Sequence, residues 1–97
     1  MKVHWTDNAL SDLKGIQAYI ALRSPQYARA MVERIFDRTE SLADLPFLGA
    51  VFPEYEEEDD SFREVFEHPY RIVYRVLTER VDIVAVVHGA RRMPADL

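Results

Sequence analysis

Basic side chains gather in the last third of the chain, where the sequence alternates as short β-strands do. The set consists of Arg63, Arg71, Arg75, His88, Arg91 and Arg92. Guanidinium groups hold phosphates and carboxylates through paired hydrogen bonds, but they stay protonated and transfer protons poorly. Within this set, only the histidine has an ordinary pKa near neutral pH. The set therefore indicates an anion-binding surface that carries a single acid–base group.

Three predicted strands position these side chains: Arg63–Phe66, Pro69–Val76 and Val81–Val87. Residues two apart share one face of a strand. One face of the sheet is expected to pack on helices through Phe62, Phe66, Ile72, Tyr74, Ile83 and Val87. The other face is expected to stay open and to carry the arginines and His88 beside Val65, Val73, Val84 and Val86. We therefore expect the functional surface on this second face.

Two amphipathic helices are predicted ahead of these strands. The first follows a short strand, Lys2–Trp5, and Thr6 is its expected N-cap. Ser24 and Pro25 have the residue types of an N-cap and a first helical position, so they predict the start of the second helix. The apolar stripes are Ala9, Leu13, Ile16 and Ile20, then Ala28, Val32, Ile35, Thr39 and Leu42. Such stripes must be buried against another layer.

The predicted element order is β-α-α-β-β-β. It predicts an α+β fold, with a two-helix hairpin packed on one face of a small, mainly antiparallel four-stranded sheet. Residues 1–97 form one predicted domain, because a chain of this length supports a single core and contains no linker or repeat.

Several classes of protein do not fit the composition. The chain has no cysteine, no Cys/His metal spacing and no Gly-rich phosphate loop, so no metal or cofactor is expected. Its N-terminus lacks the build of a signal peptide, and its longest apolar run, Ile83–Val87, is too short to span a bilayer. We expect a cytoplasmic protein that does not enter a membrane.

The net charge of −5 has a local origin. Residues 54–60 hold six of the seventeen acids and no base, and the remaining eleven acids face twelve bases. Overall acidity argues against nonspecific binding to a nucleic-acid backbone, although a local basic site stays compatible with it. The acidic run itself is compatible with a solvated loop, and also with a lid or a docking strip for a basic partner.

Taken together along nearly the whole chain, these segments resemble the RelE/ParE superfamily, the toxins of bacterial type II toxin–antitoxin modules. The resemblance rests on residues 9–13, Ile16, Tyr19, Ile20, Ser24, Pro25, Ala28, 45–49, Arg63, Glu64, 69–74 and 87–91. The Ser-Pro between the helices and the closing His88-Gly89-Ala90-Arg91 are closer to the ParE branch. Ala50 departs from this pattern, since ParE-like chains commonly have arginine there.

The two branches imply different functions. RelE-like toxins cleave mRNA on the ribosome. ParE-like toxins inhibit DNA gyrase without being nucleases, and toxins of this kind take part in plasmid stabilization. For a RelE-like enzyme the matching residues are Arg71, His88 and Arg91. For a ParE-like protein the target-binding set is the whole basic group named above.

Two features of the sequence favour the ParE branch. Val65 stands where the RelE pattern prefers a second basic residue of that strand, and no tyrosine follows Arg92. The resemblance implies a cognate antitoxin as partner, and DNA gyrase as the target. The alternatives are the ribosome with its mRNA as target, or an inactive member that only binds the antitoxin.

Overall fold

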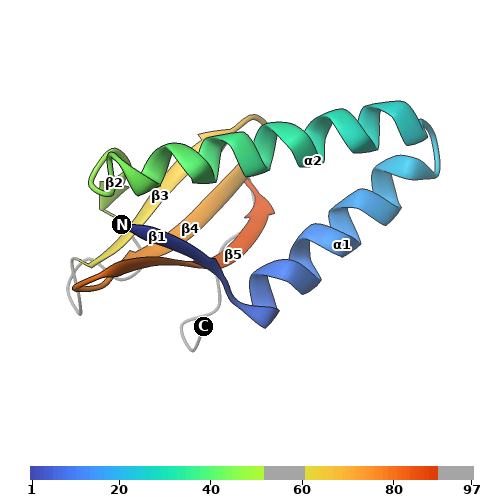
Figure 1. The fold of residues 1–97 in the computed structure, drawn as a ribbon. Coiled ribbons are helices and arrows are strands. Elements are labelled where there is room, and N and C mark those ends of the chain that lie inside the picture. Colours follow the sequence, from blue (N-terminus) through green and yellow to red (C-terminus); the bar gives the residue numbers. More distant parts are fainter. Residues whose placement is uncertain (52–60, 90–97) are drawn as a thin grey trace.

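The computed structural model describes residues 1–51 and 61–89 and forms a helical layer on one side of a sheet (Figure 1). The elements in chain order are β1 (Lys2–Trp5), α1 (Asp7–Ala21), α2 (Pro25–Glu40), the 3₁₀ turn η1 (Ser41–Ala43), β2 (Ala50–Val51), β3 (Phe62–Glu67), β4 (Tyr70–Val76) and β5 (Arg80–His88). Arg91, Arg92 and the acidic run 54–60 lie outside the described residues.

Both helices begin at the predicted caps. The Thr6 side chain accepts a hydrogen bond from the backbone N–H of Ala9, and that of Ser24 accepts one from Tyr27. Pro25 follows as the first residue of α2, where its missing N–H costs nothing. The short turn between the helices returns α2 antiparallel to α1, and the hairpin extends beyond the sheet (Figure 1).

The sheet has five strands in the order β1-β5-β4-β3-β2. Strands β2 to β5 pair antiparallel, whereas β1 pairs parallel to β5, with Lys2 opposite Arg80. The α+β architecture and the helical hairpin on one face are as predicted. The number of strands differs from the predicted four, because the two residues of β2 add a short edge strand beside β3.

The core between the helices and the sheet contains side chains from both layers. Its buried members are Ala9, Leu13, Met31, Ile35, Leu42, Val65, Tyr70, Ile72, Tyr74, Val81, Ile83 and Val86. Two predicted faces are therefore wrong in part. Val65 and Val86 were expected on the open face and are buried under the helices, whereas Phe62 and Val87 pack on the opposite side.

The register of β3 explains the first correction. Val65 lies opposite Ile72, and Phe66 lies opposite Arg71. Directly opposed side chains share a face, so Phe66 points away from the helices and is half exposed. Glu67 lies on the helical side, where its carboxylate is 3.8 Å from the Arg38 guanidinium of α2.

A β-bulge in β5 explains the second correction. The pairing steps from Ala85 opposite Val73 to Ile83 opposite Tyr74, so Val84 has no partner in β4. An extra residue in one strand shifts the alternation of all residues beyond it. The face assigned from period two is right up to Ile83 and is reversed from Ala85 onwards.

The sheet face away from the helices has a small core of its own. Val73 and Ala85 are fully buried there, with Phe62, Val84 and Val87 packed around them. This differs from the expectation of an open face that exposes its valines. In the described part of the chain, no helix is long and apolar enough to cross a membrane.

Candidate functional site

Arg71 lies in a buried ion pair on the face away from the helices. Its Nε and Nη2 both donate to Oε2 of Glu64, at 3.1 and 2.5 Å, and only 8% of Arg71 is exposed. Glu64 faces Val73 and Arg71 faces Phe66, so the two charges are diagonal neighbours on adjacent antiparallel strands. One arginine of the predicted anion-binding surface thus already holds a carboxylate of the same chain.

Arg63 lies at the other end of the sheet, where β3 begins and β4 ends. It shares the helical face with Tyr74, which is directly opposite in β4. Its Nη1 donates to the carbonyl oxygen of Gly49 at 2.8 Å, and its guanidinium lies 4.9 Å from the centre of the Phe47 ring. Its Nε is buried without a hydrogen-bond partner, and Arg63 forms no salt bridge with another described residue.

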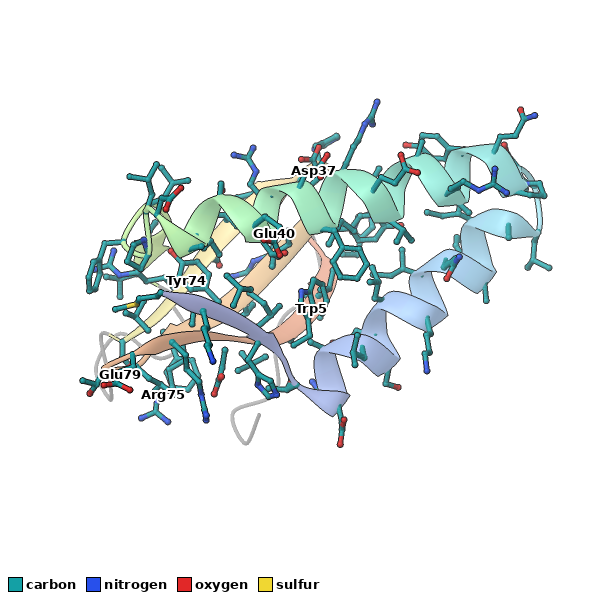
Figure 2. The ribbon with its side chains drawn as sticks, in the orientation of Figure 1. Trp5, Asp37, Glu40, Tyr74, Arg75 and Glu79 are labelled. Atoms are coloured by element: carbon teal, nitrogen blue, oxygen red, sulfur yellow. The ribbon has the colours of Figure 1, made fainter. Side chains whose placement is uncertain are left out.

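Arg75 approaches the same end of the sheet from the opposite face. Figure 2 shows Tyr74 and Arg75, neighbours in β4, on opposite sides of the sheet. Arg75 Nε donates to the Ser61 hydroxyl at 3.1 Å, and its guanidinium lies 5.1 Å from the centre of the Phe62 ring. Arg63 and Arg75 nevertheless line one hollow of about 630 Å³, together with Met1, Phe47, Val76 and Leu77.

The segment after η1 is fixed to the sheet beside this hollow. The backbone N–H of Gly49 donates to the hydroxyl oxygen of buried Tyr74 at 2.8 Å. A Cβ at position 49 would lie 2.7 Å from that hydroxyl and closer still to the carbonyl oxygen of Glu64. Glycine is therefore required by the close approach of the loop to β3 and β4. Sequence reasoning placed residues 45–49 in the family pattern but assigned them no role.

His88 lies at the far end of β5, on the side of the helices. It is opposite Tyr70 in the register, and the two rings meet edge to face at 6.1 Å. With Asp12 and Tyr19 of α1, they line a hollow of about 610 Å³ between α1 and the sheet. The structure thus separates His88 from the arginines with which the sequence grouped it, because the bulge at Val84 reverses its face.

Asp12, which lines this second hollow, has a carboxylate that bonds to the backbone of β5. The backbone N–H of Val86 donates to its Oδ2 at 3.0 Å, and Asn8 Nδ2 donates to the Val84 carbonyl at 2.8 Å. Burial raises the pKa of Asp12 despite the opposing effect of the hydrogen bond from Val86. Side chains from the first turns of α1 thus bond to backbone groups of β5 beyond the end of β1. Sequence reasoning missed this role, for which Asp12 gave no local signal.

Of the six predicted site residues, the structure brings two together, Arg63 and Arg75, at one end of the sheet. Arg71 lies in its ion pair, His88 faces α1, and Arg91 and Arg92 fall outside the described residues. A helical hairpin over one face of a mixed five-stranded sheet defines an α+β fold of the RelE/ParE type.

Comparison with known families assigns the chain to one branch. The model of the family described as the ParE toxin of type II toxin–antitoxin system, parDE, matches residues 3–93. The chain therefore belongs to the ParE toxin family. The prediction of the ParE branch of the RelE/ParE superfamily is thereby confirmed.

Comparison with solved structures gives the same answer. A chain described as "Chromosomal ParDE TA system from P. aeruginosa" matches with a TM-score of 0.73 and 26% sequence identity. The match covers 91% of this chain and 95% of the solved one. A comparison with curated proteins gave no match.

Proposed function

We propose that this ParE toxin inhibits DNA gyrase as a binding protein and that a cognate antitoxin neutralises it. One observation carries the choice of a binding protein over a ribosomal nuclease. Arg71 and His88, two of the three residues that an mRNA endonuclease would use, lie on opposite faces of the sheet. Family membership supports gyrase as the target, and an inhibitor of gyrase would act in the cytoplasm.

Cleavage of RNA through its 2′-hydroxyl requires a base, an acid and a cation around one phosphate. A proton donor or acceptor acts only within hydrogen-bond reach of the reacting atom. His88 and the Arg71 guanidinium point to opposite faces of the sheet, which disfavours their meeting at one phosphate. Arg71 would also have to leave Glu64, and breaking a buried ion pair strands a charge in the protein. The separation therefore favours binding over catalysis.

Arg71 is more useful to the fold than to a target. Because it is buried against Glu64, we propose that it holds β3 and β4 in register. Anchoring of gyrase is left to the remaining arginines of the predicted set. Arginine is enriched among residues that dominate interface energies, and complementary charge fixes orientation on a partner.

The test compares two targets for one purified toxin. We expect the toxin to block DNA supercoiling by gyrase and to leave mRNA intact on translating ribosomes. Arg91→Ala should weaken gyrase inhibition, whereas Arg34→Ala, a change on the exposed side of α2, should not. Codon-positioned mRNA cuts that disappear in His88→Ala, with gyrase unaffected, would establish the nuclease instead.

Neutralisation is tested with the protein encoded by the adjacent open reading frame. Coexpression should give a copurified complex and relieve gyrase inhibition. Exposed apolar surface on the free toxin supports this expectation, since it marks a site for a partner. The proposal fails if the toxin expressed alone is abundant and harmless and the neighbouring protein does not bind it.

A further inference from the structure

The hollow between β3, β4 and the loop after η1 combines an exposed apolar rim with a guanidinium that has no described carboxylate partner. Phe47 beside it is 61% exposed, and its neighbours Leu45 and Leu48 are 56% and 50% exposed. Arg63, on the wall of the hollow, carries a charge that no described carboxylate neutralises. An apolar rim around an uncompensated guanidinium is complementary to a ligand that has apolar and anionic groups side by side.

Loop residues 45–48 are held in place before any ligand arrives. Tyr74 and Arg63 fix the two polar groups of the Gly49 backbone, at 2.8 Å each. The Leu45 N–H donates to the Ser41 carbonyl, and the Leu48 N–H donates to the Leu45 carbonyl, both at 3.1 Å. A preformed surface loses little conformational entropy on binding, so its apolar area contributes more to affinity.

The Arg63 side chain is itself incompletely satisfied. One guanidinium nitrogen bonds to the Gly49 carbonyl, while Nε is buried without a partner. Because Nε is buried, a ligand would meet the terminal nitrogens of the guanidinium, and a carboxylate is the acceptor that matches these most closely. Arg75 lines the same hollow and adds a second positive charge. The positive charges are therefore complementary to an acidic group. Phe47, Val76 and Leu77 are complementary to an apolar side chain next to it.

We propose that this hollow is the docking site for a segment of the neutralising antitoxin that carries a carboxylate beside a large apolar side chain. The assignment rests on the proposed function, in which an antitoxin binds this toxin. A nucleic-acid phosphate would also satisfy the guanidinium. The peptide is favoured because phosphate backbones offer nothing to the apolar rim.

The experiment measures the affinity of the adjacent-gene protein for four toxin variants at two salt concentrations. Phe47→Ser removes the apolar rim, Arg63→Gln removes the charge, and Arg63→Lys keeps it. Leu22→Ser is the matched control, because Leu22 is 84% exposed at the tip of the helical hairpin, away from the hollow. Thermal melting of each variant separates loss of binding from loss of folding.

We expect Phe47→Ser and Arg63→Gln each to weaken binding by at least about tenfold, as truncated anchors do. Arg63→Gln should also flatten the salt dependence, Arg63→Lys should retain it, and Leu22→Ser should leave the affinity unchanged. Equal affinity for all variants would overturn the docking site and leave neutralisation intact. If the antitoxin does not bind even the parent toxin, the proposed neutralisation fails, and the docking site with it.

A short labelled DNA duplex tests the other ligand that Arg63 would accept. We expect no difference between the parent toxin and Arg63→Gln in binding this duplex. Duplex binding that depends on Arg63, together with antitoxin binding that does not, would reassign the hollow to a phosphate ligand and overturn the peptide assignment.

Discussion

Two arginines on neighbouring strands, Arg71 and Arg63, have opposite environments. Arg71 is buried near the turn between β3 and β4 and bonds to Glu64 with two of its nitrogens. Arg63 stands at the end of the sheet, bonds to a backbone carbonyl and lies against an exposed phenylalanine. In the sequence, both residues look alike: each is a basic residue within a predicted strand. Their neighbours across the strands differ, and this difference underlies the proposals that Arg71 supports the fold and that Arg63 meets a partner.

The difference arises from the register of β3 and β4. On the face away from the helices, Glu64 is the diagonal neighbour of Arg71. On the helical face, Arg63 meets Tyr74 and the loop that ends at Gly49. A one-residue slip of β3 would exchange these faces, bury Arg63 and expose Glu64 to the helices. The environments of the two arginines therefore depend on the pairing of β3 with β4. Substitutions at or beside each arginine test the two environments separately.

The largest effect is expected for Glu64→Gln. The change removes the Glu64 carboxylate from the buried Arg71 guanidinium, and breaking a buried pair in this way costs about 3–5 kcal/mol of unfolding free energy. Urea unfolding measures the loss. Glu67→Gln is the control, since its pair with Arg38 is 3.8 Å long and partly exposed and should cost less than about 1 kcal/mol. Equal losses for the two variants would show that Arg71 is not buried against Glu64 in solution.

Gly49→Ala should destabilise the loop beside Arg63. The new Cβ would meet the Tyr74 hydroxyl at 2.7 Å and the Glu64 carbonyl oxygen more closely, so the loop must move, at a cost of about 1–3 kcal/mol. Gly15→Ala is the matched change in α1, where nothing lies within 4 Å of the new methyl group. It should raise the unfolding free energy by about 0.5–1 kcal/mol. A thermal melt that moves both variants in the same direction would contradict the loop geometry.

Tyr74→Phe should cost about 1–2 kcal/mol at neutral pH, because the buried N–H of Gly49 loses its acceptor. Burial raises the pKa of Tyr74 above its ordinary value of 10.0, despite lowering contributions from the Gly49 hydrogen bond and Arg63. The unfolded chain therefore releases this proton first, and stability falls as the pH rises above about 10. This fall should be shallower in Tyr74→Phe in unfolding experiments at alkaline pH. An unchanged slope would exclude Tyr74 as its source.

Arg63→Gln should have the smallest effect on folding. The variant loses one hydrogen bond to Gly49 and strands no counter-charge, so we expect a loss of no more than about 1 kcal/mol. Denaturant unfolding beside Arg71→Gln gives the direct comparison. If Arg63→Gln is the more damaging of the two, the roles assigned to the two arginines are reversed.

Sequence reasoning succeeded where local chemistry decides the structure. Thr6, Ser24 and Pro25 start both helices at the predicted residues, because caps are set by the side chains next to them. The helix stripes and the faces of β4 are also as predicted. The RelE/ParE superfamily was predicted from the order of many weak motifs, and the ParE branch from the Ser-Pro between the helices and the closing His88-Gly89-Ala90-Arg91. The family match confirms both.

The site was less predictable, because it depends on contacts between strands. The segment Phe62–Glu67 alternates acceptably in either register, so only its pairing with Ile72 shows that Val65 is buried. The bulge at Val84 leaves no mark in a run of apolar residues, yet it reverses the face of His88. Gly49 and Tyr74 are far apart in sequence, and no local pattern predicts their hydrogen bond.

The parallel pairing of β1 with β5 has a consequence for synthesis of the toxin. β1 occupies residues 2–5, but its partner strand is among the last elements to leave the ribosome, and His4 meets Asp82 across 78 positions. At about 5–20 residues per second, several seconds pass between the two strands. During that interval the inner face of α1 lacks β5, the strand that packs against it. We therefore expect newly made chains to expose apolar helix surface until β5 is complete, and an antitoxin bound at that stage would act before the toxin folds.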